Sequence, residues 1–222
     1  MITHWQHAVS VGLLALYLLV LARWHGGRSP RVVSGPADFA LLMFGIGGVA
    51  LFGPFGQTLA KVLFVRPTPL DWLSLASGMT LFALLVSRRA WRRLVVYHID
   101  AATVERALEA AFAREIGAGR VLRTMHGFED LGRRRGIRIE HSPRWMTATI
   151  EAYGQEPERL IHTLEGLLVD QFRTMTLPPS KLGGLFLGGS VLTLLLAAAG
   201  WLVAQPQARA AFRVLIERLP GG

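Results

Sequence analysis

The sequence predicts a helical membrane protein that has about four transmembrane helices and carries one small α+β domain with two layers. Apolar residues make up 51% of the 222 positions, and they gather in four long stretches without Asp, Glu, Lys or Arg. A helix needs about 20 mostly apolar residues to cross a bilayer core of about 30 Å. The stretches cover residues 1–22, 39–60, 72–87 and 182–208. They predict transmembrane helices over about residues 8–23, 37–60, 70–87 and 181–204, three of them within residues 1–91.

Tryptophan placement supports these helices. Five of the six Trp residues lie near the ends of the apolar stretches, at Trp5, Trp24, Trp72, Trp91 and Trp201. An indole ring prefers the membrane interface, where its body contacts hydrocarbon and its N–H stays hydrated. Both ends of the first and third stretches are marked in this way, as expected for helices that cross a bilayer.

The charge distribution separates the apolar stretches from the region between the third and the fourth. The chain has a net charge of +9, but residues 92–180 hold 13 Arg and no Lys against 12 acidic residues. The basic excess therefore flanks the apolar stretches, as expected for topology signals and for contacts with anionic lipid headgroups. A nucleic-acid-binding domain would itself carry the excess, so nucleic acid is excluded as a partner.

The Lys and Arg residues beside the apolar stretches predict the orientation. Eight of them lie on the side that holds residues 92–180, and five lie on the other side. Because loops rich in Lys and Arg stay in the cytoplasm, we expect a cytoplasmic domain and both termini outside. The positive charges follow the first stretch, which is typical of a retained helix rather than a cleaved signal peptide. Arg is abundant while Lys occurs only at Lys61 and Lys181. We interpret this as a coding bias that favours a bacterial source, and hence a bacterial cytoplasmic membrane.

Residues 92–180 predict the cytoplasmic α+β domain. Apolar and polar residues alternate in the strand regions, and apolar residues recur at helical spacing between them. The predicted elements are a strand over 94–99, a helix over 101–115 capped by Asp100, a hairpin over 137–141 and 146–153, and a helix from Pro157. This order favours an antiparallel sheet with helices on one face, which is a ferredoxin-like two-layer sandwich or part of one.

Small residues in two predicted transmembrane helices indicate faces for close helix packing. In a bilayer, helices associate where small side chains let the backbones approach. Gly184 and Gly188 form such a pair in the fourth helix, and Gly45 and Gly48 lie in the second. We expect these glycines to pack against other helices of the chain or of a partner subunit. Residues 205–222 predict an amphipathic tail at the interface.

The sequence predicts no catalytic residue, no metal site and no cofactor. It contains no Cys, which excludes thiolate nucleophiles and Cys-ligated metals. No ionisable side chain lies in the middle of an apolar stretch, so a transporter would lack its usual proton or ion carriers. The seven His residues offer no ligand pair on facing helices. We expect His25 and His98 to face solvent.

Two function classes remain. We favour a non-catalytic membrane subunit that packs against and stabilises a larger complex, with the cytoplasmic domain docking a soluble partner. The alternative is a small membrane enzyme or lipid-handling protein that acts at the headgroup layer, near His126, His141 and the basic run 133–135. A sensor with a ligand-binding domain is a third option. The arginines expected to contact lipid headgroups are Arg88, Arg89, Arg92, Arg93, Arg133, Arg134 and Arg135.

Overall fold

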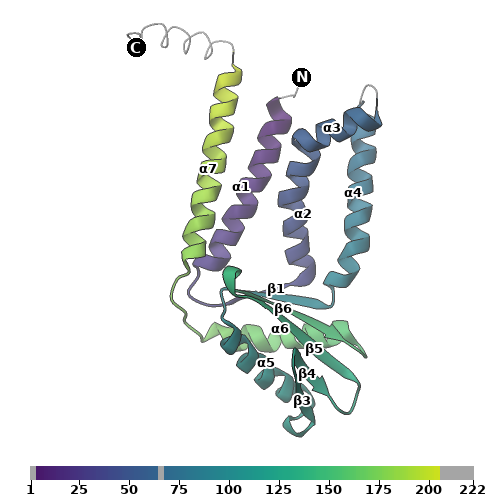
Figure 1. Ribbon diagram of the computed structural model, residues 1–222, viewed down its shortest axis with the longest axis vertical. Coiled ribbons are helices and arrows are strands. Elements are labelled where there is room, and N and C mark those ends of the chain that lie inside the picture. The colour runs from purple at the N-terminus through teal and green to yellow at the C-terminus, as the bar shows by residue number, and fades with distance from the viewer. Residues whose placement is uncertain (1–3, 65–67, 206–222) are drawn as a thin grey trace.

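The computed structural model describes residues 4–64 and 68–205, and its apolar helices stand on a layer formed by a sheet (Figure 1). Among the described residues, five helices extend away from the sheet or lie beyond it on the same side. They are α1 (His4–Gly26), α2 (Gly35–Phe52), α3 (Pro54–Leu63), α4 (Pro69–Ala90) and α7 (Lys181–Ala204). The helix α3 lies across the far ends of α2 and α4, and α1 begins and α7 ends at the side away from the sheet (Figure 1).

Three helices within the described residues are long and apolar enough to cross a membrane, namely Ala8–Gly26, Leu70–Ala90 and Lys181–Gly200. The single helix predicted over 37–60 is corrected to two, because α2 ends at Phe52 and α3 begins at Pro54. Pro54 has no N–H with which to continue the hydrogen-bond ladder of α2. Gly53 joins the two helices. A side chain at this position would collide with the end of α2, because a Cβ there would lie only 2.2 Å from the Val49 carbonyl oxygen.

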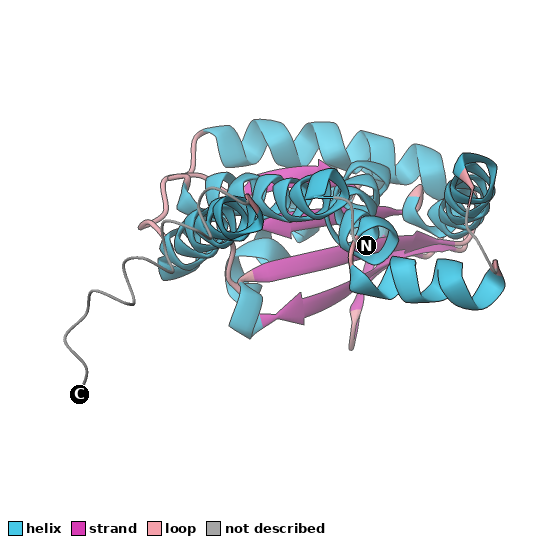
Figure 2. Cartoon of the chain, turned by 90° about the horizontal axis from the view of Figure 1, so that it is seen from above, coloured by secondary structure: helices cyan, strands magenta, loops and turns pink. Residues whose placement is uncertain are grey.

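The second layer is a six-stranded antiparallel sheet in the described part of the chain, with the order β1-β2-β6-β5-β4-β3. The strands are β1 (Arg31–Ser34), β2 (Arg93–Tyr97), β3 (Val121–Thr124), β4 (Gly127–Asp130), β5 (Arg135–Ser142) and β6 (Thr147–Tyr153). Two helices, α5 (Ala101–Ile116) and α6 (Pro157–Arg173), cover the face away from the apolar helices (Figure 1). Seen from above, the strands pass beneath the apolar helices (Figure 2).

Local sequence signals account for the ends of several elements. The Asp100 side chain accepts a hydrogen bond of 2.9 Å from the Thr103 N–H and so caps α5, as predicted. Thr68 and Asp71 form a reciprocal capping box at the start of α4. The strands β5 and β6 form the predicted hairpin.

The main hydrophobic core lies between the sheet and the helices α5 and α6. Leu94 and Val96 of β2 and Ile150 of β6 are fully buried on this side of the sheet. Their helix partners include Val104, Leu108 and Phe112 of α5 and Leu160, Leu164 and Leu168 of α6. Burial of each large apolar side chain contributes about 1.5–3 kcal/mol, so this core holds both helices on the sheet.

Strand β1 was not predicted, and it links the two layers. It lies in the chain between α1 and α2, outside the predicted domain range of 92–180, and places Val32 opposite Val96 of β2. With β1 on one side and β6 on the other, β2 becomes an interior strand. Val95 and Tyr97 of β2 are buried on the side of the apolar helices. The small core there consists of Leu21, Val33, Val95 and Tyr97, with Tyr17, Trp24 and Phe186 packed against it.

Candidate functional site

The helices α1 and α2 approach each other closely at two glycines. A Cβ on Gly45 would lie 2.6 Å from the Tyr17 side chain, and a Cβ on Gly48 would lie 2.4 Å from the Leu13 side chain. Only a hydrogen at these positions leaves room for α1. Both glycines are among those that the sequence indicated for helix packing, and in the structure they face a helix of the same chain.

The helices α1 and α7 also meet at small residues. A Cβ on Gly183 would lie 2.7 Å from the Gly26 Cα, so the two backbones nearly touch at this point. Farther along, the Ser190 hydroxyl donates a buried hydrogen bond of 2.8 Å to the Ala15 carbonyl oxygen. Such a bond is well shielded from competing water and fixes the rotation of α7 about its axis relative to α1.

Gly184 and Gly188, the pair that the sequence indicated in α7, do not take part in this contact. No atom of the described residues lies within 4 Å of a Cβ placed on either glycine, apart from their own surroundings in the helix. Their neighbours Gly183 and Gly189 face α1 instead. The packing of Gly184 and Gly188 against another helix therefore stays a prediction.

A groove of about 900 Å³ opens between α1 and α7 at the end nearest the sheet. Arg23 of α1 and Arg31 of β1 line it, and so do the apolar side chains Leu19 and Leu187. Because a helix advances about 5.4 Å per turn, Leu19 lies one turn farther from the sheet than Arg23. Gly184 also lines the groove. The groove thus has a basic end at the sheet and an apolar end along the helices.

A second cavity, of about 380 Å³, lies where α1, α7 and the sheet meet. It is lined by the rings of Tyr17, Tyr97, Trp145 and Phe186, together with His25. The His25 ring centroid is 5.4 Å from that of Tyr97 and 5.3 Å from that of Phe186. His25 is only 1% exposed, and its Nδ1 has no hydrogen-bond partner in the described part of the chain.

Polar groups beside this cavity connect β2 with α2. The Tyr97 hydroxyl donates a hydrogen bond to Asp38 Oδ1, and burial and the Asp38 carboxylate raise the pKa of Tyr97. The next residue, His98, is fully buried and has a left-handed backbone with φ of 61°. Burial lowers the pKa of His98, while the Pro178 carbonyl acts in the opposite direction. The His98 ring is therefore neutral at pH 7.

The expectation that His25 and His98 face solvent was wrong, and the sequence did not indicate the aromatic cavity. Its rings come from α1, β2, α7 and the turn Pro143–Trp145, which are far apart in the chain. The pairing of β1 with β2 brings the end of α1 to β2, where the His25 ring packs against Tyr97, and this contact has no local sequence signal. The aromatic residues at stretch ends could equally have formed an interfacial belt.

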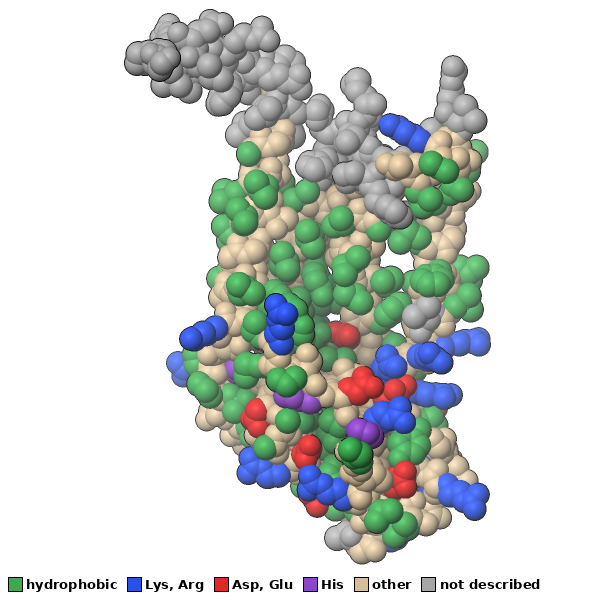
Figure 3. Space-filling view, in the orientation of Figure 1, with side chains coloured by type: hydrophobic (Ala, Val, Ile, Leu, Met, Phe, Trp, Pro, Cys, Tyr) green, Lys and Arg blue, Asp and Glu red, His purple; other side chains and the backbone are tan. Residues whose placement is uncertain are grey.

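The arginines expected at the headgroup layer have different surroundings. Arg88 and Arg89 are exposed in the last turn of α4. Two others form ion pairs, Arg92 with Glu158 at 2.7 Å and Arg93 with Glu151 at 3.3 Å. Many Lys and Arg side chains gather at the level where the helices meet the sheet, below a mostly hydrophobic surface (Figure 3). Such a distribution is typical of proteins whose helices lie in hydrocarbon and whose polar layer lies in water.

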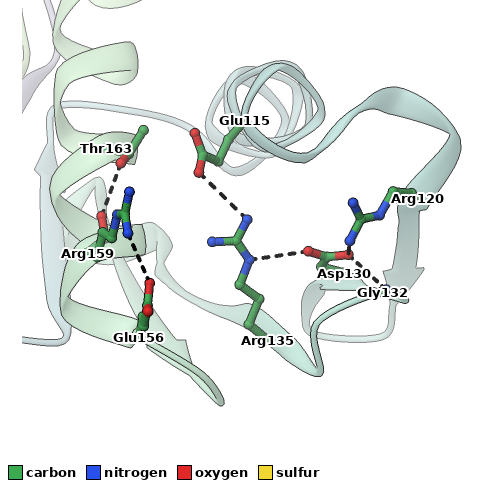
Figure 4. A network of polar contacts seen from close by, with 8 residues as sticks. All are labelled: Glu115, Arg120, Asp130, Gly132, Arg135, Glu156, Arg159 and Thr163. Atoms are coloured by element: carbon green, nitrogen blue, oxygen red, sulfur yellow. Dashed lines mark hydrogen bonds and ion pairs between the residues drawn. The ribbon is translucent and has the colours of Figure 1, made fainter.

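Arg135, the last residue of the basic run 133–135, is buried inside the domain. Its side chain is 6% exposed, and its guanidinium lies 3.2 Å from Asp130 and 3.6 Å from Glu115 (Figure 4). The two preceding arginines are exposed. Arg135 therefore ties the start of β5 to β4 and to the end of α5, and it is not accessible to lipid headgroups.

Asp130 is the centre of this network. Its side chain is fully buried, and it accepts hydrogen bonds from the Gly132 N–H at 2.9 Å and from Arg120 at 2.8 Å in addition to Arg135. Burial opposes the charge of Asp130, but these donors outweigh it and lower the pKa of the carboxyl. A charged Asp130 is therefore part of the folded domain.

The residues that suggested chemistry at the headgroup layer do not form one site. His126 and His141 do line a common cavity of about 110 Å³, together with Glu105 and Arg123. Arg123 forms an ion pair with Glu105 at 2.6 Å, so this carboxylate is already engaged. The run 133–135 does not line that cavity. In the part of the chain that the structure describes, no group of three His, Cys, Asp or Glu side chains could hold a metal ion.

Comparisons with known proteins do not assign the chain to a family. No family model matches it, and no curated protein or solved structure matches it either.

Proposed function

We propose that the chain is an integral membrane subunit that packs against and stabilises a larger complex in a bacterial cytoplasmic membrane. Its N-terminus and the end of α7 would lie outside, and the sheet domain would lie in the cytoplasm, on the side with more flanking Lys and Arg. The observation that carries this proposal is the helix α4, whose apolar surface the rest of the described residues leaves uncovered.

The helix α4 has 22 residues and would be about 33 Å long, enough to cross a hydrocarbon core of about 30 Å. Its large side chains are exposed, including Leu70 at 73% and Phe82 at 64%. Among its described side chains only Ala90, beside the sheet, is buried. Water would penalise this surface by about 25 cal/mol per Å², so α4 needs lipid or protein around it.

A second feature of α4 supports a protein partner on one side. Ser74 and Gly78 lie one turn apart and are both exposed. A Cβ on Gly78 would have no atom within 4 Å in the described part of the chain, so this small-residue face is open. Pairs of small residues at this spacing let helices pack closely in a bilayer. The similar pair Gly184 and Gly188 in α7 is open as well.

The way the sheet is built supports a role in which the domain braces the helices. We read it as a ferredoxin-like sandwich in which β2 and β5 run parallel with β6 between them and α5 connects them. The position beside β2, which a strand following α6 would take in that fold, is occupied by β1. The strand β1 directly precedes α2, and β2 follows α4. The pairing of β1 with β2 therefore fixes one end of each of these helices at the sheet.

Isolation of the protein from native membranes in mild detergent tests the proposal. We expect a complex with a stoichiometric partner in wild type and loss of that partner in Gly78→Leu, because the new side chain holds the partner helix away. Leu73→Ala is the matched control, since five residues of helix place it on another side of α4. A wild-type protein that runs alone on native gels, or a partner retained by Gly78→Leu, would contradict the proposal.

Topology is tested separately with reporter fusions. A reporter fused after Arg93 or at Pro179 should score as cytoplasmic, and one after Lys61 should score as external. The reverse pattern would contradict the proposed orientation while leaving the partner assay unaffected.

A further inference from the structure

The groove between α1 and α7 has the shape and charge of a site for a single lipid. We propose that it holds one anionic phospholipid of the cytoplasmic leaflet, with the phosphate at Arg23 and Arg31 and an acyl chain along Leu19 and Leu187. This inference rests on the proposed membrane insertion. It assigns Gly184 to the lipid rather than to a partner helix.

The groove exists because glycines, which have no side chain, lie where α1 and α7 cross. At Gly183 the backbone of α7 comes so close to Gly26 that a Cβ would lie 2.7 Å from its Cα. At the next residue, Gly184, nothing lies within 4 Å of an added Cβ among the described residues. The helices thus nearly touch at Gly183 and leave the groove of about 900 Å³ beside this contact. That volume is within the range of about 300–1,000 Å³ typical of ligand pockets.

The charges in the groove match a phosphate. Arg23 and Arg31 are exposed, and neither forms an ion pair within the described residues. No Asp or Glu is among the residues that line the groove, whereas Ser29 adds a hydroxyl. Guanidinium groups bind phosphate oxygens through paired, charge-assisted hydrogen bonds. An anion held here would meet two positive groups and no negative one.

The apolar end of the groove distinguishes a phospholipid from free phosphate. Leu19, Val20 and Leu187 line the part that runs along the helices, away from the sheet. A phospholipid matches both ends, since its phosphate lies at the headgroup layer and its acyl chains run into the hydrocarbon. Inorganic phosphate would use only the basic end and would gain nothing from the apolar residues.

The walls of the groove are held in place before a lipid binds. The Leu177 N–H donates a hydrogen bond of 2.6 Å to the Arg28 carbonyl oxygen, which ties the segment before α7 to the segment after α1. The pairing of β1 with β2 fixes the backbone of Arg31. A preformed site loses less conformational entropy on binding than a site that must be ordered.

Native mass spectrometry of the full chain tests the site, using protein released from nanodiscs of equal phosphatidylglycerol and phosphatidylcholine. Wild type should retain one phosphatidylglycerol in preference to phosphatidylcholine. Arg23→Gln and Arg31→Gln should each weaken this retention about fivefold, the fold-change that corresponds to about 1 kcal/mol per basic residue. Gly184→Leu should abolish it, because the new side chain begins in open space and would occupy the groove.

Two matched variants control for general effects. Gly188→Leu adds the same side chain one turn away and outside the groove, and Arg89→Gln removes an exposed charge from the end of α4. Both should retain phosphatidylglycerol as wild type does. Equal retention of both lipids, displacement by inorganic phosphate, or a Gly184→Leu variant that behaves like Gly188→Leu would overturn the inference.

Carbonate extraction separates this inference from the proposed function. A wild-type chain that stays in the membrane fraction without a retained phosphatidylglycerol would overturn the lipid site alone. A wild-type chain released by carbonate would instead overturn membrane insertion, and the lipid site with it.

Discussion

The sheet domain and the layer of apolar helices differ in how far their large apolar side chains are exposed. In the domain, Phe112 of α5 and Leu164 of α6 are fully buried against the sheet. In the helical layer, Leu81 and Leu85 of α4 are each 60% exposed. The domain supplies its own partners for apolar surface, whereas the helical layer depends on its environment. Bilayer hydrocarbon and partner helices are the environments in which such a layer is stable.

A comparison within the helical layer refines this difference. The spans in α1 and α4 are similar in length and composition, yet 28% of the α1 span and none of the α4 span is buried. The difference comes from Gly45 and Gly48 on the neighbouring helix α2 and from the contact with α7, which all face α1. Apolar content therefore shows which helices can enter a membrane but not which of them pack together.

The largest expected effect is a loss of stability in the sheet domain. Asp130→Ala removes the buried carboxylate that Arg135 and Arg120 share, leaving Arg135 with only the longer contact to Glu115 among the described residues. Loss of one partner from a buried ion pair costs about 3–5 kcal/mol. We expect denaturant unfolding of the detergent-solubilised chain, followed by amide hydrogen exchange in the domain, to show a loss of that order.

The control for this prediction is the exposed pair in the same region. Arg159 and Glu156 lie 3.4 Å apart with most of both side chains exposed (Figure 4). Arg159→Ala should leave the unfolding curve unchanged, because exposed ion pairs contribute little. Equal stabilities of the two variants would mean that the Asp130 network does not stabilise the domain.

The second prediction tests packing within the helical layer. Gly48→Leu places a side chain where even a Cβ would lie 2.4 Å from Leu13, whereas a Cβ on Gly78 of α4 would have no atom of the described residues within 4 Å. Overpacking of this kind costs about 1–3 kcal/mol. Thermal unfolding of the isolated chain in detergent should therefore occur at a lower temperature for Gly48→Leu and at the wild-type temperature for Gly78→Leu. A similar loss in both variants would remove the distinction between α1 and α4.

The smallest expected effect concerns the junction between the two regions. Burial holds the pKa of His98 below its ordinary value of about 6.5, so the unfolded chain binds the proton more readily. Stability is then complete above about pH 6.5 and falls as the pH drops toward the folded pKa, by at most about 1.4 kcal/mol per pH unit. We expect wild type to lose stability between pH 7 and pH 5.

His98→Asn provides the comparison, because Asn tolerates the left-handed backbone and does not titrate in this range. Its stability should depend less steeply on pH than that of wild type. Equally steep pH profiles of the two proteins would show that protonation of His98 does not cause the loss of stability in wild type.

Much of the architecture could be predicted from the sequence because it depends on neighbouring residues. Uninterrupted apolar runs determine where α1, α4 and α7 lie, since a helix long enough for a bilayer must be apolar along its whole length. The cap at Asp100 and the alternation in β5 and β6 are equally local, and each is present. Even the break in the second predicted span has a local cause in Pro54, although the sequence predicts a single helix over 37–60.

Only the tertiary structure decided which of these elements meet. The pairing of Val32 with Val96 places β1 in the sheet and brings the end of α1, where His25 is buried, to β2, which the buried His98 follows, although these segments are far apart in the chain. The position of a glycine in a helix shows that a backbone can approach there, but not whether one does. Gly48 therefore meets a helix while Gly184 faces a groove. Contacts between distant segments depend on the whole arrangement, which no local pattern encodes.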